Sequence, residues 1–201
     1  MKYLYWLLCY ISMLLPMLSH ATVGGPQSIE VLGYDASEQK VYLLRHFYDG
    51  RGRLPQLYYY LLTSRTPQQQ IGVRSLYINP QTQQIDVDQD PQKFNQALEK
   101  IKNRLQMLQP IPHQTLQLKI LQRKQKLINV SNTTIRQYQY RYQLKRSGLY
   151  SPVVTAYSYT PKIEMSQSYL IPNHNKIIAV VKYQGIAMEG GYWIEDALIL
   201  K

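Results

Sequence analysis

The chain has 201 residues, of which 45% are hydrophobic and 17% are charged, and its 23 Lys and Arg outnumber 12 Asp and Glu. This composition is that of a globular protein and excludes an intrinsically disordered chain. The length allows one domain or two small ones, and no self-similarity with a period of roughly 20 to 50 residues indicates a solenoid.

The first 21 residues have the three parts of a secretory signal peptide. Lys2 precedes an uncharged apolar run over residues 3–18, and a Ser-His-Ala sequence ending at Ala21 places small residues at a cleavage site. The alternative is an uncleaved anchor, but the run is shorter than the ~20 residues that a spanning helix needs. We therefore expect residues 1–21 to be removed, residues 22–201 to form a single domain, and the mature protein to be periplasmic or secreted. Cys9 is the only cysteine, so this domain would contain no disulfide.

The charge of the mature chain is concentrated in its middle third. Residues 91–162 include 13 basic residues and one acid, Glu99, whereas residues 22–90 and 163–201 each have a net charge of −1. Such asymmetry indicates an anionic partner.

The first part of the mature chain is expected to form β-structure. Runs rich in β-branched and aromatic residues predict strands over residues 28–34, 40–48 and 56–63, with turn residues between them. A weaker fourth strand is expected over residues 73–78.

An amphipathic helix is expected over residues 91–108. Asp90 can cap its N-terminus and Pro91 suits the first helical position. One apolar stripe follows the helical period, and it consists of Phe94, Leu98, Ile101, Leu105 and Leu108. The cations Lys93, Lys100 and Arg104 fall mostly off this stripe, which predicts a basic outer face.

Beyond the helix the hydrophobic period changes to two. Residues 115–128 and 133–146 predict a long hairpin in which Tyr138, Tyr140 and Tyr142 share one face. Further strands are expected over residues 152–159, 177–183 and 191–200, and the continuous apolar run 177–181 predicts a central strand covered on both faces. The predicted fold is therefore α+β: a largely antiparallel, strongly curved β-sheet with the helix of residues 91–108 packed on it.

Catalytic chemistry has little support in the sequence. His46 and Asp49, beside the Arg51-Gly52-Arg53 loop, form the best cluster for an active site, although a solvated hairpin loop explains them as well. No nucleophile elbow, phosphate-binding loop or dinucleotide fingerprint is present, and no cofactor is implied.

Metal chemistry is equally weak. The alternating carboxylates Asp86, Asp88 and Asp90 lack the Gly and Glu of a calcium loop, and they also suit the N-terminus of a helix. Glu195 and Asp196 are adjacent on a predicted strand, so they should face opposite ways. No metal site is therefore predicted.

The basic hairpin over residues 115–146 is the best candidate for a binding site. Its anion-binding candidates are Arg123, Lys124, Lys126, Arg136, Arg141, Lys145 and Arg146. We expect a non-catalytic exported protein whose partner is an anionic polymer or an anionic lipid surface, with no small-molecule ligand inferable and protein partners unknown. Three alternatives stay open: a solvated strand face balanced by acids from elsewhere, an enzyme with a site assembled from distant strands, and a small outer-membrane barrel, which the predicted helix disfavours.

Overall fold

The computed structural model describes residues 24–50, 52–130, 132–186 and 191–201. The predicted signal peptide, its cleavage site at Ala21 and Cys9 lie outside these ranges. The described residues form mostly antiparallel strands, 54% of the structure, with one α-helix among them. The predicted α+β class is therefore confirmed.

The strands form three sheets and the helix lies outside them. The N-terminal sheet has the order β1-β2-β3-β4, with β1 (Gln27–Asp35), β2 (Lys40–Phe47), β3 (Gln56–Leu61) and β4 (Gln70–Gly72). The central sheet has the order β12-β11-β10-β5, with β12 (Tyr192–Leu200), β11 (Ile177–Ile186), β10 (Ile163–Leu170) and β5 (Gln109–Pro110). The basic sheet consists of β6 (Gln117–Val130), β7 (Thr133–Arg146) and β8 (Leu149–Tyr150), with β9 (Val154–Ser158) also beside β7. Helix α2 spans Pro91–Lys102, and two 3-10 turns span Ser75–Tyr77 and His113–Thr115.

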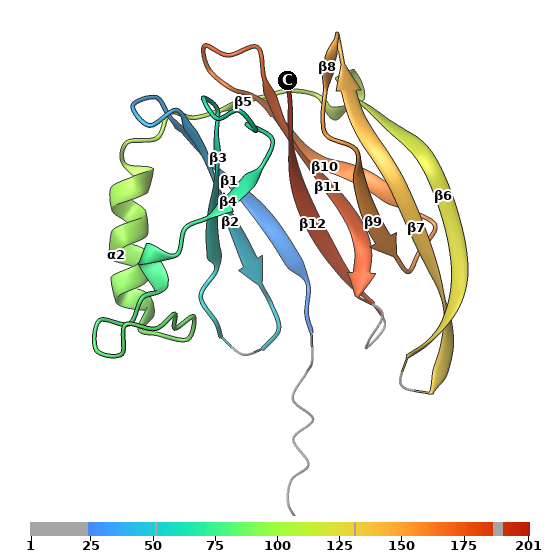
Figure 1. Cartoon of the computed structure of the whole chain (residues 1–201), viewed down its shortest axis with the longest axis horizontal. Helices are drawn as coiled ribbons and strands as arrows, with labels where there is room; N and C mark the ends of the chain where they lie inside the picture. Colours follow the sequence, from blue (N-terminus) through green and yellow to red (C-terminus); the bar gives the residue numbers. More distant parts are fainter. Residues whose placement is uncertain (1–23, 51, 131, 187–190) are drawn as a thin grey trace, which may run out of the picture.

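The helix and the three sheets are stacked as four layers (Figure 1). Phe94 is buried between α2 and the N-terminal sheet. Leu43 and Val180 pack between the N-terminal and central sheets. Tyr142 and Val181 pack between the central and basic sheets. The basic sheet is thus an outer layer, and its face away from the central sheet is open.

The central strand predicted at residues 177–181 is confirmed. Strand β11 lies between β12 and β10, and its residues from Ile177 to Val181 are at most 1% exposed. Ile178 and Val180 face the N-terminal sheet, whereas Ile177, Ala179 and Val181 face the basic sheet. Because both faces are covered by other sheets, the run is apolar at every position rather than at every second one.

The strong curvature predicted for the sheet is not found. Among the described residues no sheet is closed or strongly curled, and the strands are divided among three stacked sheets. Stacking separate sheets buries their apolar faces, as curling a single sheet would. A central sheet that is covered on both sides does not need to curl around its own core.

Helix α2 is shorter than predicted and ends at Lys102 rather than at residue 108. The backbone of Gln106 exchanges two hydrogen bonds with Tyr34 of β1, at 2.8 and 2.9 Å, which requires extended backbone there. Gly33 permits this crossing, since a Cβ at its positive φ of 148° would lie 2.8 Å from the Gln106 carbonyl oxygen. Arg104 consequently leaves the helix and pairs with Asp35, with 2.6 Å between Nε and Oδ2. The predicted basic outer face of the helix therefore retains only Lys93 and Lys100 of the three cations.

One predicted strand is absent, and the eight-residue strand β10 was not predicted. Residues 73–78 form no strand; β4 precedes them, and Tyr77 is buried with its hydroxyl donating to the Pro55 carbonyl at 2.7 Å. Strand β10 was not predicted, because a bulge between Met165 and Gln167 interrupts its period of two. Met165 and Leu170 both contact the core shared with the basic sheet although their numbers differ in parity.

In the described part of the chain, no helix is long and apolar enough to cross a membrane.

Candidate anion-binding surface

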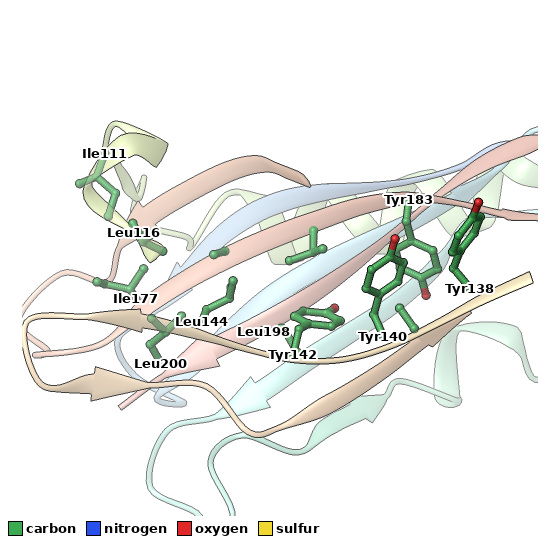
Figure 2. Packing of buried hydrophobic residues seen from close by; sticks show 13 residues of the cluster. Ile111, Leu116, Tyr138, Tyr140, Tyr142, Leu144, Ile177, Tyr183, Leu198 and Leu200 are labelled. Carbon is green, nitrogen blue, oxygen red and sulfur yellow. The ribbon is translucent and has the colours of Figure 1, made fainter. Parts of the chain in front are cut away.

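The hairpin of β6 and β7 is built on a tyrosine stripe. Tyr138, Tyr140 and Tyr142 alternate along β7 and are at most 8% exposed, because they pack against β11 and β12 of the central sheet. Figure 2 shows aromatic rings, including that of Tyr183, at one end of this layer and aliphatic side chains at the other. The burial of these tyrosines defines the inner face of β7, which is the face toward the central sheet. The outer face then carries Gln137, Gln139, Arg141, Gln143 and Lys145.

The pairing with β7 assigns a face to every residue of β6. Residues directly opposite in an antiparallel pair lie on the same face. Lys124 is opposite Gln139 and Lys126 is opposite Gln137, so both lysines lie on the outer face. Arg123 is opposite Tyr140 and lies on the inner face.

The seven predicted anion-binding residues therefore divide between two faces. Four share the outer face: Lys124, Lys126, Arg141 and Lys145. Three belong to the inner face: Arg123, Arg136 and Arg146. The sequence-based set is not one surface.

Two of the inner-face arginines lie beside aromatic side chains of the core. The guanidinium of Arg123 lies 4.9 Å from the ring centre of Tyr138 and 5.8 Å from that of Tyr140. Burial raises the pKa of the Tyr140 hydroxyl above its usual value, and the positive charge of Arg123 opposes this shift. At the hairpin tip, Arg136 lines an open pocket of about 490 Å³ together with Tyr138 and Tyr159. Arg123 and Arg136 are exposed and stack on or flank aromatic rings of the inner face.

The outer face has a fifth cation, Lys119, which the sequence-based set lacked. Lys119 is opposite Gln143, and the bulge between Ile120 and Gln122 shifts the register between Lys119 and the later lysines. Within β6 alone, Lys119 and Lys124 differ in parity and would be assigned to opposite faces. Only the pairing with β7 shows that they share one face.

The outer face is unusually free of negative charge. No Asp or Glu occurs anywhere between residues 100 and 163, which include the whole basic sheet. Considering the described residues only, none of the sheet's eight cations is within ion-pair distance of a carboxylate. The alternative of a face balanced by acids from elsewhere has no support in these contacts.

A shallow groove lies on this outer face between β6, β7 and β9. It has a volume of about 210 Å³ and is lined by Lys124, Gln125, Lys126, Gln137, Gln139 and Tyr157. The ring of Tyr157 is 47% exposed, and its hydroxyl accepts a hydrogen bond from Gln139 Nε2 at 3.3 Å. The groove thus combines two cations, amides and an accessible aromatic face. Tyr157 was not recognised as a site residue in the sequence, because strand alternation alone does not distinguish an exposed tyrosine from a buried one.

The members of the alternative catalytic cluster make the following contacts. His46 Nε2 lies 2.8 Å from Glu30 Oε2, across the β1–β2 pair, and its ring stacks on Tyr48. Asp49 instead pairs with Arg53, with 3.0 Å between Oδ2 and Nε. Both side chains thus take part in ion pairs of the β1–β2 region and its loop.

The carboxylates considered for metal binding have structural roles. Asp90 caps α2 by accepting a hydrogen bond from the Gln92 backbone at 2.9 Å. Glu195 accepts the Ile29 backbone N–H at 2.8 Å, whereas Asp196 accepts the Tyr183 hydroxyl at 2.6 Å, and these contacts lie on opposite faces of β12 as predicted. Over the described ranges, no cluster of three or more His, Cys, Asp or Glu could hold a metal ion.

Compared with protein-family models, with curated proteins and with solved structures, the chain matches none of them.

Proposed function

We propose that this chain is an exported, non-catalytic binding protein whose basic sheet contacts an extended anionic polymer. The binding surface is the outer face of β6, β7 and β9. One observation carries the proposal: five cations, from Lys119 to Lys145, share an open face that no described carboxylate neutralises.

The geometry of a β-sheet suits a repeating ligand. Alternate residues of one strand are ~7 Å apart, and neighbouring strands are ~4.8 Å apart. Lys124 and Lys126 therefore present charges at a short repeat along β6, while Arg141 of β7 adds a second row. A polymer with regularly spaced negative groups can contact several of these cations together.

The composition of the face favours a polymer over a lipid surface. The groove residues between the cations are the amides Gln137 and Gln139 and the exposed ring of Tyr157. Amides and an aromatic face suit hydrogen bonding to, and stacking on, sugar rings or bases. Leu127, the most exposed apolar side chain of β6 at 66%, lies on the inner face, where it cannot insert into a membrane that contacts the outer one.

The proposal is tested by salt elution from immobilised heparin with two variants of equal charge. The outer-face variant replaces Lys119, Lys124, Lys126 and Arg141 with Gln. The control variant replaces four exposed cations of other layers, Arg65, Arg74, Lys93 and Lys100, with Gln. Both variants lose four positive charges, so a general effect of net charge is the same in each.

We expect the outer-face variant to elute at clearly lower salt than the parent, and the control variant to elute close to it. Circular dichroism establishes that both variants are folded. Equal shifts in the two variants would show attraction by net charge alone and would refute a defined surface. Binding of the parent to anionic vesicles but not to heparin would replace the polymer with a lipid surface.

A further inference from the structure

The base of the β6–β7 hairpin has a second feature, a pocket beside Arg146. We propose that this pocket binds a single oxyanion group, such as a phosphate or a sulfate, through the guanidinium of Arg146. The proposed function does not require this site, because Arg146 lies on the inner face of β7 and the polymer surface on the outer face.

The first observation is one buried nitrogen of the partly exposed Arg146 guanidinium, which has no partner among the described residues. Nη1 of Arg146 is inaccessible to solvent and makes no hydrogen bond within the described structure. Arg146 also forms no ion pair with a described carboxylate, in a sheet that contains no acid. A buried charged donor without an acceptor is unfavourable, and such groups in native proteins are usually satisfied by a ligand, ion or water.

The second observation is the pocket that Arg146 lines. It has a volume of about 330 Å³, near the lower end of the range of ~300–1,000 Å³ for small-ligand sites. Its walls include Gln114, Thr115, Gln117, Lys145, Arg146 and Ser147. Thr115 already donates its hydroxyl hydrogen to the Pro112 carbonyl at 2.7 Å. The remaining polar groups are one hydroxyl, two amides and two cations, so the pocket is rich in donors.

The chemistry of these groups indicates the class of ligand. A planar guanidinium binds two oxygens of a phosphate or sulfate in parallel, and a lysine ammonium adds a point charge. Lys145 lies on the outer face and lines the pocket as well, so the pocket opens where the two faces meet at the end of β7. No carboxylate among the described residues lines it to repel an anion.

The site is tested by NMR titration of the full mature chain with inorganic phosphate, and separately with sulfate, at constant ionic strength against chloride. We expect saturable shifts confined to backbone amides around the pocket, including those of Gln117 and Ser147. In Arg146→Gln the dissociation constant should rise about tenfold or more, since hydrogen bonds to charged groups contribute ~1.5–3 kcal/mol. The phosphate and sulfate arms show which oxyanion is preferred.

The matched control is Arg136→Gln, which removes an exposed inner-face arginine at the far end of the hairpin and should leave the affinity unchanged. Equal weakening in both variants, or parent shifts that spread over the sheet without saturating, would overturn the proposal. If Arg146→Gln does not fold, the location and saturation of the shifts in the parent still decide. The outer-face variant retains Lys145 and should bind phosphate normally, so this site and the polymer surface can fail independently.

Discussion

Strands β11 and β6 are both long antiparallel strands, yet their surroundings differ as much as two strands can. The first five residues of β11 are almost completely buried, whereas eleven of the fourteen residues of β6 are exposed. β11 lies between two other strands and between two other sheets; β6 pairs only with β7, at the edge of an outer layer. The apolar run of β11 contributes to stability. The outer-face cations of β6 do not pack in a core and can contact a partner.

Charged residues of the N-terminal sheet and of the basic sheet also differ in their surroundings. In the N-terminal sheet, the buried carboxylate of Asp35 accepts hydrogen bonds from Ser37, Glu38 and Arg104. In the basic sheet, exposed cations have no carboxylate partner among the described residues. The charge of Asp35 is satisfied within the protein, whereas the outer-face cations of the basic sheet are exposed. Substitutions in the two regions should therefore affect different properties.

The largest effect is expected from truncating the buried strand. Ile178→Ala removes a side chain that is fully buried between the N-terminal and central sheets. We expect a loss of about 2–5 kcal/mol in the free energy of unfolding, because a cavity is left in a packed layer. Urea denaturation measures this loss. A cost below about 1 kcal/mol would mean that the layer collapses around the cavity and that β11 is less central than its burial indicates.

A smaller effect is expected from replacing the buried, hydrogen-bonded carboxylate of Asp35. Burial, the largest single influence, raises the pKa of Asp35, but the hydrogen bonds from Ser37 and Glu38 and the Arg104 guanidinium outweigh it, so the pKa lies below its usual value. This carboxylate therefore stabilises the fold above its unfolded-state pKa of about 3.9, and that contribution is lost as the pH falls through the lower folded-state pKa.

Asp35→Asn should consequently cost about 1–3 kcal/mol at neutral pH. The difference in unfolding free energy between parent and variant should shrink as the pH is lowered through this acidic range. Denaturation at a series of pH values measures both quantities. A difference that stays constant with pH would assign the loss to packing rather than to the charge of Asp35.

The smallest effect on stability is expected on the exposed strand. Leu127→Ala changes the most exposed apolar side chain of β6, and surface substitutions of this kind usually alter stability by less than about 0.5 kcal/mol. Denaturation under the same conditions as for Ile178→Ala gives the comparison directly. A cost of more than about 1 kcal/mol would show that something covers this face of β6 in solution.

The sequence predicted those parts of the fold whose pattern is local. The uninterrupted apolar run of β11 indicated a strand covered on both faces, and the alternating tyrosines of β7 indicated which face of that strand is buried. The end of the helix could not be predicted locally. Leu105 and Leu108 continue the apolar stripe, but the pairing of Gln106 with Tyr34 of β1, distant in sequence, ends the helix before them.

The faces of the candidate site could not be predicted from local sequence either. A strand's own alternation gives the relative faces of its residues, but the register between two strands decides which residues of β6 join which face of β7. The bulge after Ile120 places Lys119 on the same face as Lys124 and leaves Arg123 beside the tyrosines. The residue types at the bulge do not identify it in the sequence. The sequence showed that the hairpin is basic, but not how its cations divide between two faces.

The proposed contact between the outer face and a polyanion is measured by the salt dependence of polymer binding in the outer-face variant. Binding to a single-stranded oligonucleotide, measured by fluorescence anisotropy over a range of salt concentrations, gives the slope of log K against log salt. Each lost phosphate contact reduces the magnitude of that negative slope by about 0.7. Replacing Lys119, Lys124, Lys126 and Arg141 should therefore make the slope about three units less negative, while the control variant keeps the parent slope. An outer-face variant with the parent slope would contradict the account, because these four cations would then make no contact with the polymer.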